Sequence, residues 1–154
     1  MKTDRIRQTA RQLLGEFGKR NVAKLCGCPK CKRFGTLVRL PTNFKCADLI
    51  CDFCGYLAQV KTTRVKRVRE IPDSILGAAW GPQEARMKSG IYFPLYLVLV
   101  DTEGKRSIFY LASDLQEPKM FVPRRPLSPR ARRAGWQGFS YNLCSVKDRF
   151  VQLH

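Results

Sequence analysis

The stretch that decides the fold is Lys45–Thr63, KCADLICDFCGYLAQVKTT. It contains a Cys-x-x-Cys pair, Cys51 and Cys54, with apolar residues at strand-like spacing on both sides. We expect this pair to lie at the tip of a β-hairpin whose arms are residues 44–50 and 56–62. The remainder of the chain should be organised around that hairpin.

Polar residues on the two arms form a candidate metal site. Asp48 lies on the incoming arm, and Gln59 and Lys61 lie on the outgoing arm. Alternate residues of a strand point to the same face, so the amide and the amine should project together. If the arms pair, Asp48 comes close to both. An acid, an amide oxygen and a lysine at one place can hold a divalent cation and a water.

The charge of the chain predicts a polyanionic partner. Its 154 residues include 29 Lys and Arg against 12 Asp and Glu, a net charge of +17, with 44% hydrophobic and 10% aromatic residues. This length and apolar content suit one folded domain, residues 1–154, with one core. A chain this basic repels itself unless it meets a polyanion. Nucleic acid is the first candidate, and an anionic membrane is the second.

The chain lacks the roughly 18 to 20 continuous apolar residues that a membrane span needs. Its start, Met-Lys-Thr-Asp-Arg, leads into a polar amphipathic stretch rather than a signal peptide. We therefore expect a cytoplasmic protein. Seven cysteines in a reducing compartment indicate metal ligands before disulfides.

Four of these cysteines have the spacing of a zinc site. Cys28 and Cys31 form one Cys-x-x-Cys pair, and Cys51 and Cys54 form the second. Two such pairs supply the four thiolates of a structural Zn²⁺ ion, so we expect a zinc-binding insertion over about residues 26–54. With four protein ligands, the ion has no open position for a catalytic water. Cys26 and Cys46 are spare and could substitute for a neighbouring ligand. The simpler interpretation of these two, and of Cys144, is a small buried hydrophobe.

A basic loop at about residues 123–138 is a candidate DNA contact, because arginines and prolines surround one tryptophan there. Guanidinium groups bind phosphates, and an aromatic ring can stack on bases or wedge between them. The alternative is a solvated basic loop that the tryptophan anchors. The candidate contact residues are Arg124, Arg125, Arg130, Arg132, Arg133 and Trp136.

Periodicity predicts the other elements. Apolar residues from Ile6 to Phe17 fall at helical spacing, and Gly18 is the expected stop. Glu16 on this helix could reach a metal site, although a solvated acid is the simpler interpretation. A second helix, with Pro82 in its first turn, is expected within residues 71–90. Strands are expected at 94–101, which should be central, and at 107–112, 139–145 and 150–153.

Four segments also carry a family resemblance. They are Cys-Pro-Lys-Cys at 28–31, Ala-Asp-Leu-Ile-Cys-Asp-Phe-Cys at 47–54, Gln-Val-Lys at 59–61 and Arg-Pro-Leu-Ser-Pro-Arg-Ala-Arg-Arg-Ala-Gly-Trp at 125–136. In order, over about residues 20 to 145, they resemble the catalytic domain of the DpnI-type restriction endonucleases, the Dam-replacing protein family. The resemblance implies an α/β (α+β) fold of PD-(D/E)XK type, a mixed sheet flanked by helices with an inserted four-cysteine zinc ribbon. It also implies magnesium-dependent cleavage of double-stranded DNA with N6-methyladenine at G-A-T-C sites.

By position, Asp48 matches the family's aspartate, Lys61 matches its lysine, and the four paired cysteines match its zinc ligands. Magnesium would then be held by Asp48, Gln59 and the Val60 carbonyl, and Lys61 would orient the attacking water. Gln59 departs from the family, which carries glutamate there, and the change removes one negative charge from the metal site. The family's winged-helix domain, which also reads the methylated site, is expected to be absent.

Three functions remain open at this point. The first is a magnesium nuclease that acts on methylated DNA. The second is a non-cleaving methylated-DNA-binding protein, in which Gln59 marks a degenerate nuclease site. The third is a zinc-ribbon nucleic-acid binder unrelated to nucleases, against which the Asp48–Lys61 pattern and the segment 125–136 both argue.

Overall fold

The computed structural model describes residues 8–42, 44 and 47–154. Two α-helices are present in them, α1 (Ala10–Leu25) and α2 (Trp80–Lys88). The strands are β1 (Leu37–Arg39), β2 (Leu49–Cys51), β3 (Leu57–Arg64), β4 (Ser74–Ala79), β5 (Leu95–Val100), β6 (Arg106–Leu111), β7 (Phe121–Pro123), β8 (Gly138–Asn142) and β9 (Val151–Gln152).

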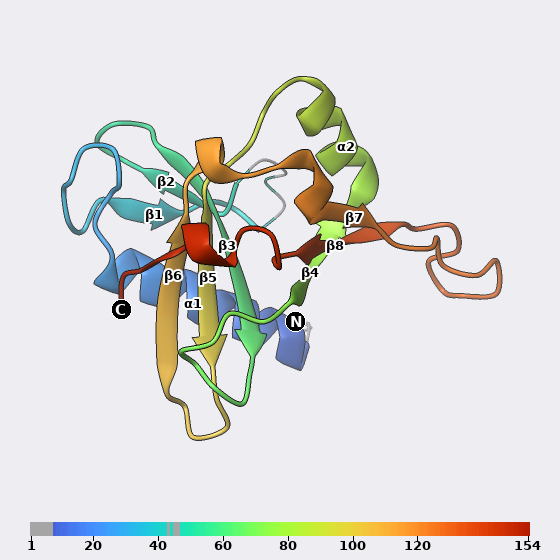
Figure 1. Cartoon of the computed structure of the whole chain (residues 1–154), viewed down its shortest axis with the longest axis horizontal. Helices are drawn as coiled ribbons and strands as arrows, with labels where there is room; N and C mark the ends of the chain where they lie inside the picture. Colours follow the sequence, from blue (N-terminus) through green and yellow to red (C-terminus); the bar gives the residue numbers. More distant parts are fainter. Residues whose placement is uncertain (1–7, 43, 45–46) are drawn as a thin grey trace, which may run out of the picture.

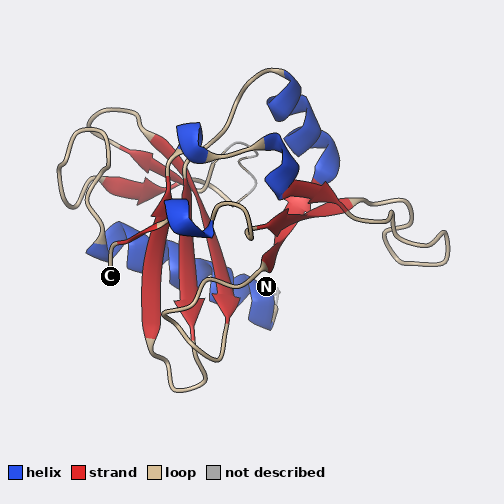
Figure 2. Cartoon of the chain, viewed as in Figure 1, coloured by secondary structure: helices blue, strands red, loops and turns tan. Residues whose placement is uncertain are grey.

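The strands form two sheets (Figure 1 and Figure 2). The larger sheet has the order β1-β2-β3-β5-β6-β9, and the smaller has the order β4-β8-β7. β3 and β5 pair in parallel, whereas the other paired strands run antiparallel. The mixed α+β class expected from the sequence is therefore present.

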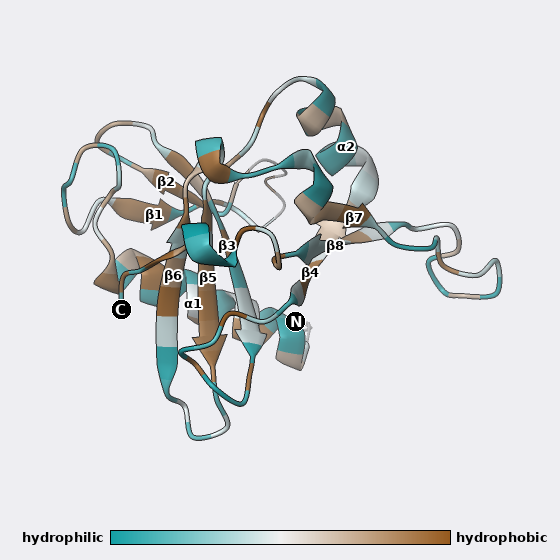
Figure 3. Ribbon diagram, viewed as in Figure 1, coloured by the Kyte–Doolittle hydropathy of each residue, from teal (hydrophilic) through white to brown (hydrophobic). Residues whose placement is uncertain are grey.

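β5 is the central strand that the apolar run predicted, and all six of its residues are buried. The ribbon of β5 is largely hydrophobic (Figure 3). Its side chains alternate between two apolar cores. Tyr96 and Val98 join the core beneath α1 and the cysteines, whereas Leu95 and Leu97 join the core beneath the smaller sheet. The sequence led us to expect one core, but this strand divides the apolar side chains between the two faces of its sheet.

The predicted stop at Gly18 was wrong, because α1 continues to Leu25. The helix begins with a capping box, in which Thr9 and Gln12 each accept the other's backbone N–H. Gly18 is buried where α1 crosses β3, and a Cβ there would lie 1.7 Å from Thr62 Oγ1. The glycine therefore sets how closely the helix approaches the strand that carries Lys61.

Gly18→Ala should destabilise the fold by about 1–3 kcal/mol, the usual cost of overpacking a tight contact. Gly15→Ala is the matched control, because it lies in the same helix and its added methyl would meet nothing within 4 Å. That control should stabilise the fold by up to about 1 kcal/mol, since alanine favours helix. Urea unfolding measures both changes. Equal stabilities would show that the close approach at Gly18 is not needed.

Several expected boundaries change for local reasons. The arm expected at 44–50 contributes only its last residues to β2, and residues 45 and 46 lie outside the described part. The strand expected at 139–145 ends at Asn142, whose side chain accepts the Cys144 N–H and turns the chain. The second helix has Pro82 in its first turn, as expected. Short or interrupted strands that the sequence analysis missed are β1, β4 and β7.

Within the described residues, neither helix combines the length and apolar character that crossing a membrane requires.

Candidate functional site

The four cysteines expected to bind zinc lie together. Their Sγ atoms are all within 4.8 Å of one another, with 3.6 Å between Cys28 and Cys54 and 3.7 Å between Cys31 and Cys51. Tetrahedral zinc with Zn–S bonds of about 2.3 Å separates its sulfurs by about 3.8 Å, so the cluster fits this ion. It joins the loop after α1 to the tip of the β2–β3 hairpin.

The hydrogen bonds around Cys51 favour the thiolate, the form that binds metals. Burial raises the pKa of this thiol, but its hydrogen bond with the Thr36 side chain and those from the backbone N–H groups of Cys54 and Phe53 lower it to about 6. Among the spare cysteines, Cys26 is buried as expected, Cys46 lies outside the described residues, and Cys144 is exposed, contrary to expectation.

Asp48 is held against β3 by its side chain and its backbone. The predicted arms pair antiparallel, with Leu49 opposite Ala58. The Asp48 N–H donates to the Ala58 carbonyl at 3.0 Å, and Asp48 Oδ2 accepts the Val60 N–H at 2.8 Å. The carboxylate is therefore fixed beside the residues of β3 that the sequence analysis selected.

Gln59 and Lys61 share a face of β3, as strand alternation predicted, because they lie opposite Leu95 and Leu97 of the parallel β5. This face looks toward the smaller sheet, from which the Tyr141 hydroxyl donates to Gln59 Oε1 at 3.3 Å. Burial, and then the nearby Asp48 charge, raise the pKa of Tyr141, so it stays a proton donor. No motif marked Tyr141, which lies in a different sheet.

Two hollows meet at Asp48 and Lys61, which line both. One, of about 410 Å³, lies between α1, β3 and β4, and its wall includes Lys19. The other, of about 540 Å³, lies between β3 and α2, and its wall includes Gln59 and Arg86. We call the two hollows together the Asp48 cleft.

The family comparison matches the DpnI, or Dam-replacing, family over residues 2–152. This chain belongs to the Dam-replacing family. Membership indicates a restriction endonuclease that acts on methylated DNA. DNA is thus the partner that family membership implies. Its charged phosphates would need cationic side chains in the cleft.

In this member of the Dam-replacing family, cationic groups surround Asp48. Lys19 Nζ lies 3.5 Å from Asp48 Oδ1, and 3.7 Å from Glu16 Oε1 on the same helix. Glu16 also pairs with Arg39, so it is part of an ion-pair network that is linked to Asp48 through Lys19. Lys19 was missed because its partner Asp48 is distant in sequence.

Lys61 lines both hollows of the cleft, and its surroundings shift its pKa. Burial lowers its pKa, and this exceeds the opposing effect of Asp48, while the charges of Lys19 and Arg86 lower the pKa further. A desolvated ammonium among like charges is strongly attracted to an anion. The Asp48 cleft can therefore receive a phosphate between its cations.

The basic loop of this Dam-replacing protein connects β7 to β8 and projects from the smaller sheet (Figure 1). The Leu127 N–H donates to the Trp136 carbonyl at 2.8 Å, and the Arg133 guanidinium lies 4.8 Å from the centre of the Trp136 ring. Trp136 is half-buried over Gly138, where a Cβ would lie 2.8 Å from the ring. None of its predicted contact residues lines the Asp48 cleft, and the exposed ones are Arg124, Arg125, Arg130, Arg132 and Arg133.

Proposed function

We propose that this protein is a metal-dependent endonuclease, a single domain with a PD-(D/E)XK core, that hydrolyses phosphodiester bonds in N6-adenine-methylated DNA at a GATC-like site. The observation that carries the proposal is the convergence of Asp48, Gln59 and Lys61 in one cleft of a Dam-replacing protein. The cluster of cysteines would hold a structural zinc that fixes the hairpin of this cleft.

The oxygens around Asp48 fit magnesium in kind, because this hard cation prefers carboxylate, carbonyl and amide oxygens. Asp48, Gln59 Oε1 and the Val60 carbonyl would hold it. Magnesium bound there would polarise the scissile phosphate and acidify a water. The Tyr141 hydroxyl donates to this same Gln59 Oε1 and would help to orient the amide. Lys61 would position the attacking water and stabilise charge on the phosphate.

The charges of the cleft make metal binding depend on DNA. Gln59 contributes no charge, and Lys19 already lies 3.5 Å from the Asp48 carboxylate. A phosphate between Lys19, Lys61 and Arg86 would supply the missing negative charge. Magnesium affinity should therefore be low for the free protein and higher for its complex with DNA.

The same charges favour a second candidate, a methylated-DNA-binding protein that does not cut. Lys19, Lys61 and Arg86 outnumber the single carboxylate of Asp48 and can bind a phosphate without any metal. The arginine loop would add backbone contacts, and Trp136 would act against bases or a methyl group.

Plasmid digestion tests the proposal. Adenine-methylated and unmethylated plasmids are incubated with magnesium or manganese, with a chelator control. Cutting of the methylated plasmid alone supports the proposal in full. Cutting of both supports the nuclease without its methyl specificity. Binding by gel shift without any cutting supports the non-cleaving candidate and contradicts ours.

Gln59→Glu should raise the affinity for Mn²⁺ by about tenfold or more, because each added ligand charge strengthens such sites. The measurement is a calorimetric titration of Mn²⁺ with and without DNA. Gln12→Glu is the control, since it adds the same charge at an exposed position of α1 that lines neither hollow, and a glutamate can still accept the Thr9 N–H there. Unchanged affinity in Gln59→Glu, or an equal gain in the control, would remove Gln59 from the metal site.

A further inference from the structure

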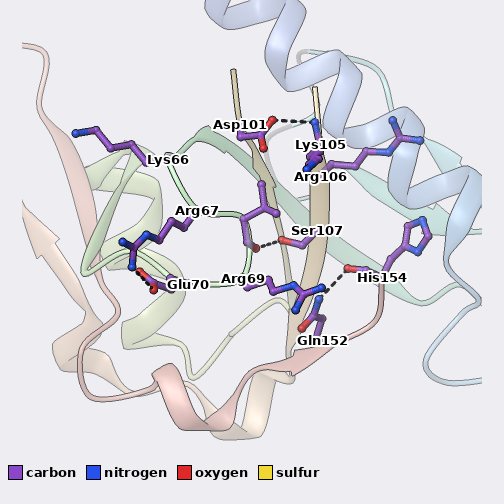
Figure 4. Close-up of a pocket in the computed structure, with 11 residues that line it drawn as sticks. Lys66, Arg67, Arg69, Glu70, Asp101, Lys105, Arg106, Ser107, Gln152 and His154 are labelled. Carbon is purple, nitrogen blue, oxygen red and sulfur yellow. Dashed lines mark hydrogen bonds and ion pairs between the residues drawn. The ribbon is translucent and has the colours of Figure 1, made fainter. Parts of the chain in front are cut away.

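A second basic cavity, of about 850 Å³, lies apart from the Asp48 cleft and shares no lining residue with it (Figure 4). Its walls are the segment that follows β3, the turn between β5 and β6, and the end of the chain after β9. Cationic side chains outnumber acidic ones in the lining. They are Lys66, Arg67, Arg69, Lys105 and Arg106, against Glu70 and Asp101.

Both acidic side chains of this cavity already have partners within the protein. Glu70 pairs with Arg67 at 3.1 Å. Asp101 Oδ1 accepts the backbone N–H groups of Glu103 and Lys105, each at 2.9 Å. By contrast, Lys66 and Arg69 form no ion pair with any described residue. Their charges are available for an anion from outside.

The wall that carries these two cations is held firmly against the larger sheet. The buried Ser107 hydroxyl donates to the Val68 carbonyl, between Lys66 and Arg69 (Figure 4). The Val65 N–H donates to the Val100 carbonyl at 2.9 Å. A fixed backbone lowers the ordering cost when an anion binds.

We propose that this cavity binds phosphate groups of a nucleic-acid backbone, as a contact separate from the Asp48 cleft and from the arginine loop. The inference rests on the proposed DNA substrate, which supplies a polyanion for a chain of net charge +17. Val68 is the one aliphatic residue in the lining, so the cavity has no cluster of apolar side chains for insertion into lipid. The contact would depend on the charge of the phosphates and not on the base sequence.

The test compares two double variants of the full chain. Lys66→Gln with Arg69→Gln removes two charges from the cavity. Arg20→Gln with Lys24→Gln removes two charges from exposed positions of α1 outside it, where neither side chain has an ion pair among the described residues. Fluorescence anisotropy measures binding to duplex DNA at several salt concentrations, without divalent metal, so that cutting does not enter.

The cavity variant should flatten the plot of log K against log salt by about 1.8, at about 0.9 for each lost phosphate contact, and the control should change it far less. If the effect appears with a 30-base-pair duplex and vanishes with 10 base pairs, the phosphates belong to DNA flanking the cleft. If the effect persists with 10 base pairs, as the loss of a second bound duplex, the phosphates belong to a second DNA molecule.

Equal slopes for the parent and the cavity variant would overturn the inference, and so would an equal change in the control. If the cavity variant loses binding to anionic vesicles but binds DNA like the parent, the inference is overturned in favour of a membrane surface. A parent that binds no DNA contradicts the proposed function as well. A parent that binds DNA as tightly as its cavity variant contradicts only the second contact.

Discussion

Replacing Lys61 by methionine should lower DNA cleavage by a factor of about 10²–10³ while DNA binding persists, since that is the usual loss when one preorganised electrostatic donor is removed. Methionine keeps the apolar stem of the buried side chain but has no ammonium to position the water. Cleavage is measured in single-turnover digestion, and binding is measured by anisotropy without metal. Lys24→Met, at an exposed position on α1, should cut like the parent.

The same variant should be as stable as the parent or more stable at pH 7. Burial lowers the pKa of Lys61 in the folded state below its ordinary value of 10.5. The unfolded chain therefore binds more protons between the two pKa values, and parent stability rises with pH across that window. Lys61→Met lacks this rise, so its advantage should shrink as the pH approaches 10.5. Urea unfolding at several pH values measures it, and full cutting by this variant would exclude Lys61 from the mechanism.

Cys51→Ser should abolish zinc binding and with it most of the folding free energy. A structural zinc site contributes on the order of 10 kcal/mol, which equals the whole stability of a typical domain. Cys51 ends β2, and its loss frees the hairpin that carries Asp48 on one side and Lys61 on the other. We expect the variant to lose its cooperative unfolding transition and its cutting together.

Zinc content by mass spectrometry and thermal unfolding by circular dichroism measure these effects. Cys144→Ser is the control, because this exposed cysteine lies outside the cluster and should leave both unchanged. A Cys51→Ser protein that melts like the parent with no zinc bound would show that the ion is dispensable. A zinc-loaded Cys51→Ser protein would place the ion elsewhere.

The parts of the site that could be predicted depend on neighbours in the sequence. Paired cysteines form tight turns, and Gln59 and Lys61 alternate along one strand, so spacing alone placed them together. The end of the helix was misplaced at Gly18 because glycine often ends a helix. Here Gly18 lies inside α1, where Thr62 of β3 packs against it.

Residues that reach the cleft from other elements had no signal in the local sequence. Lys19 and Arg86 reach the cleft from two helices, and Tyr141 reaches it from the smaller sheet. Their residue types are common on helices and strands, and only the folded arrangement distinguishes them from other lysines, arginines and tyrosines. The charge balance around Asp48, which separates the two candidate functions, was therefore hidden in the sequence.

The hydrogen bond from Tyr141 to Gln59 joins residues 82 positions apart. During synthesis, Asp48 and Lys61 leave the ribosome long before the tyrosine that completes their cleft. A nascent chain can close its cysteine knuckle early, yet the hydrogen bond from Tyr141 to Gln59 forms only once β8 has been made. Assembly of the cleft thus waits for β8, so the paired cysteines should become ordered before the site that they support.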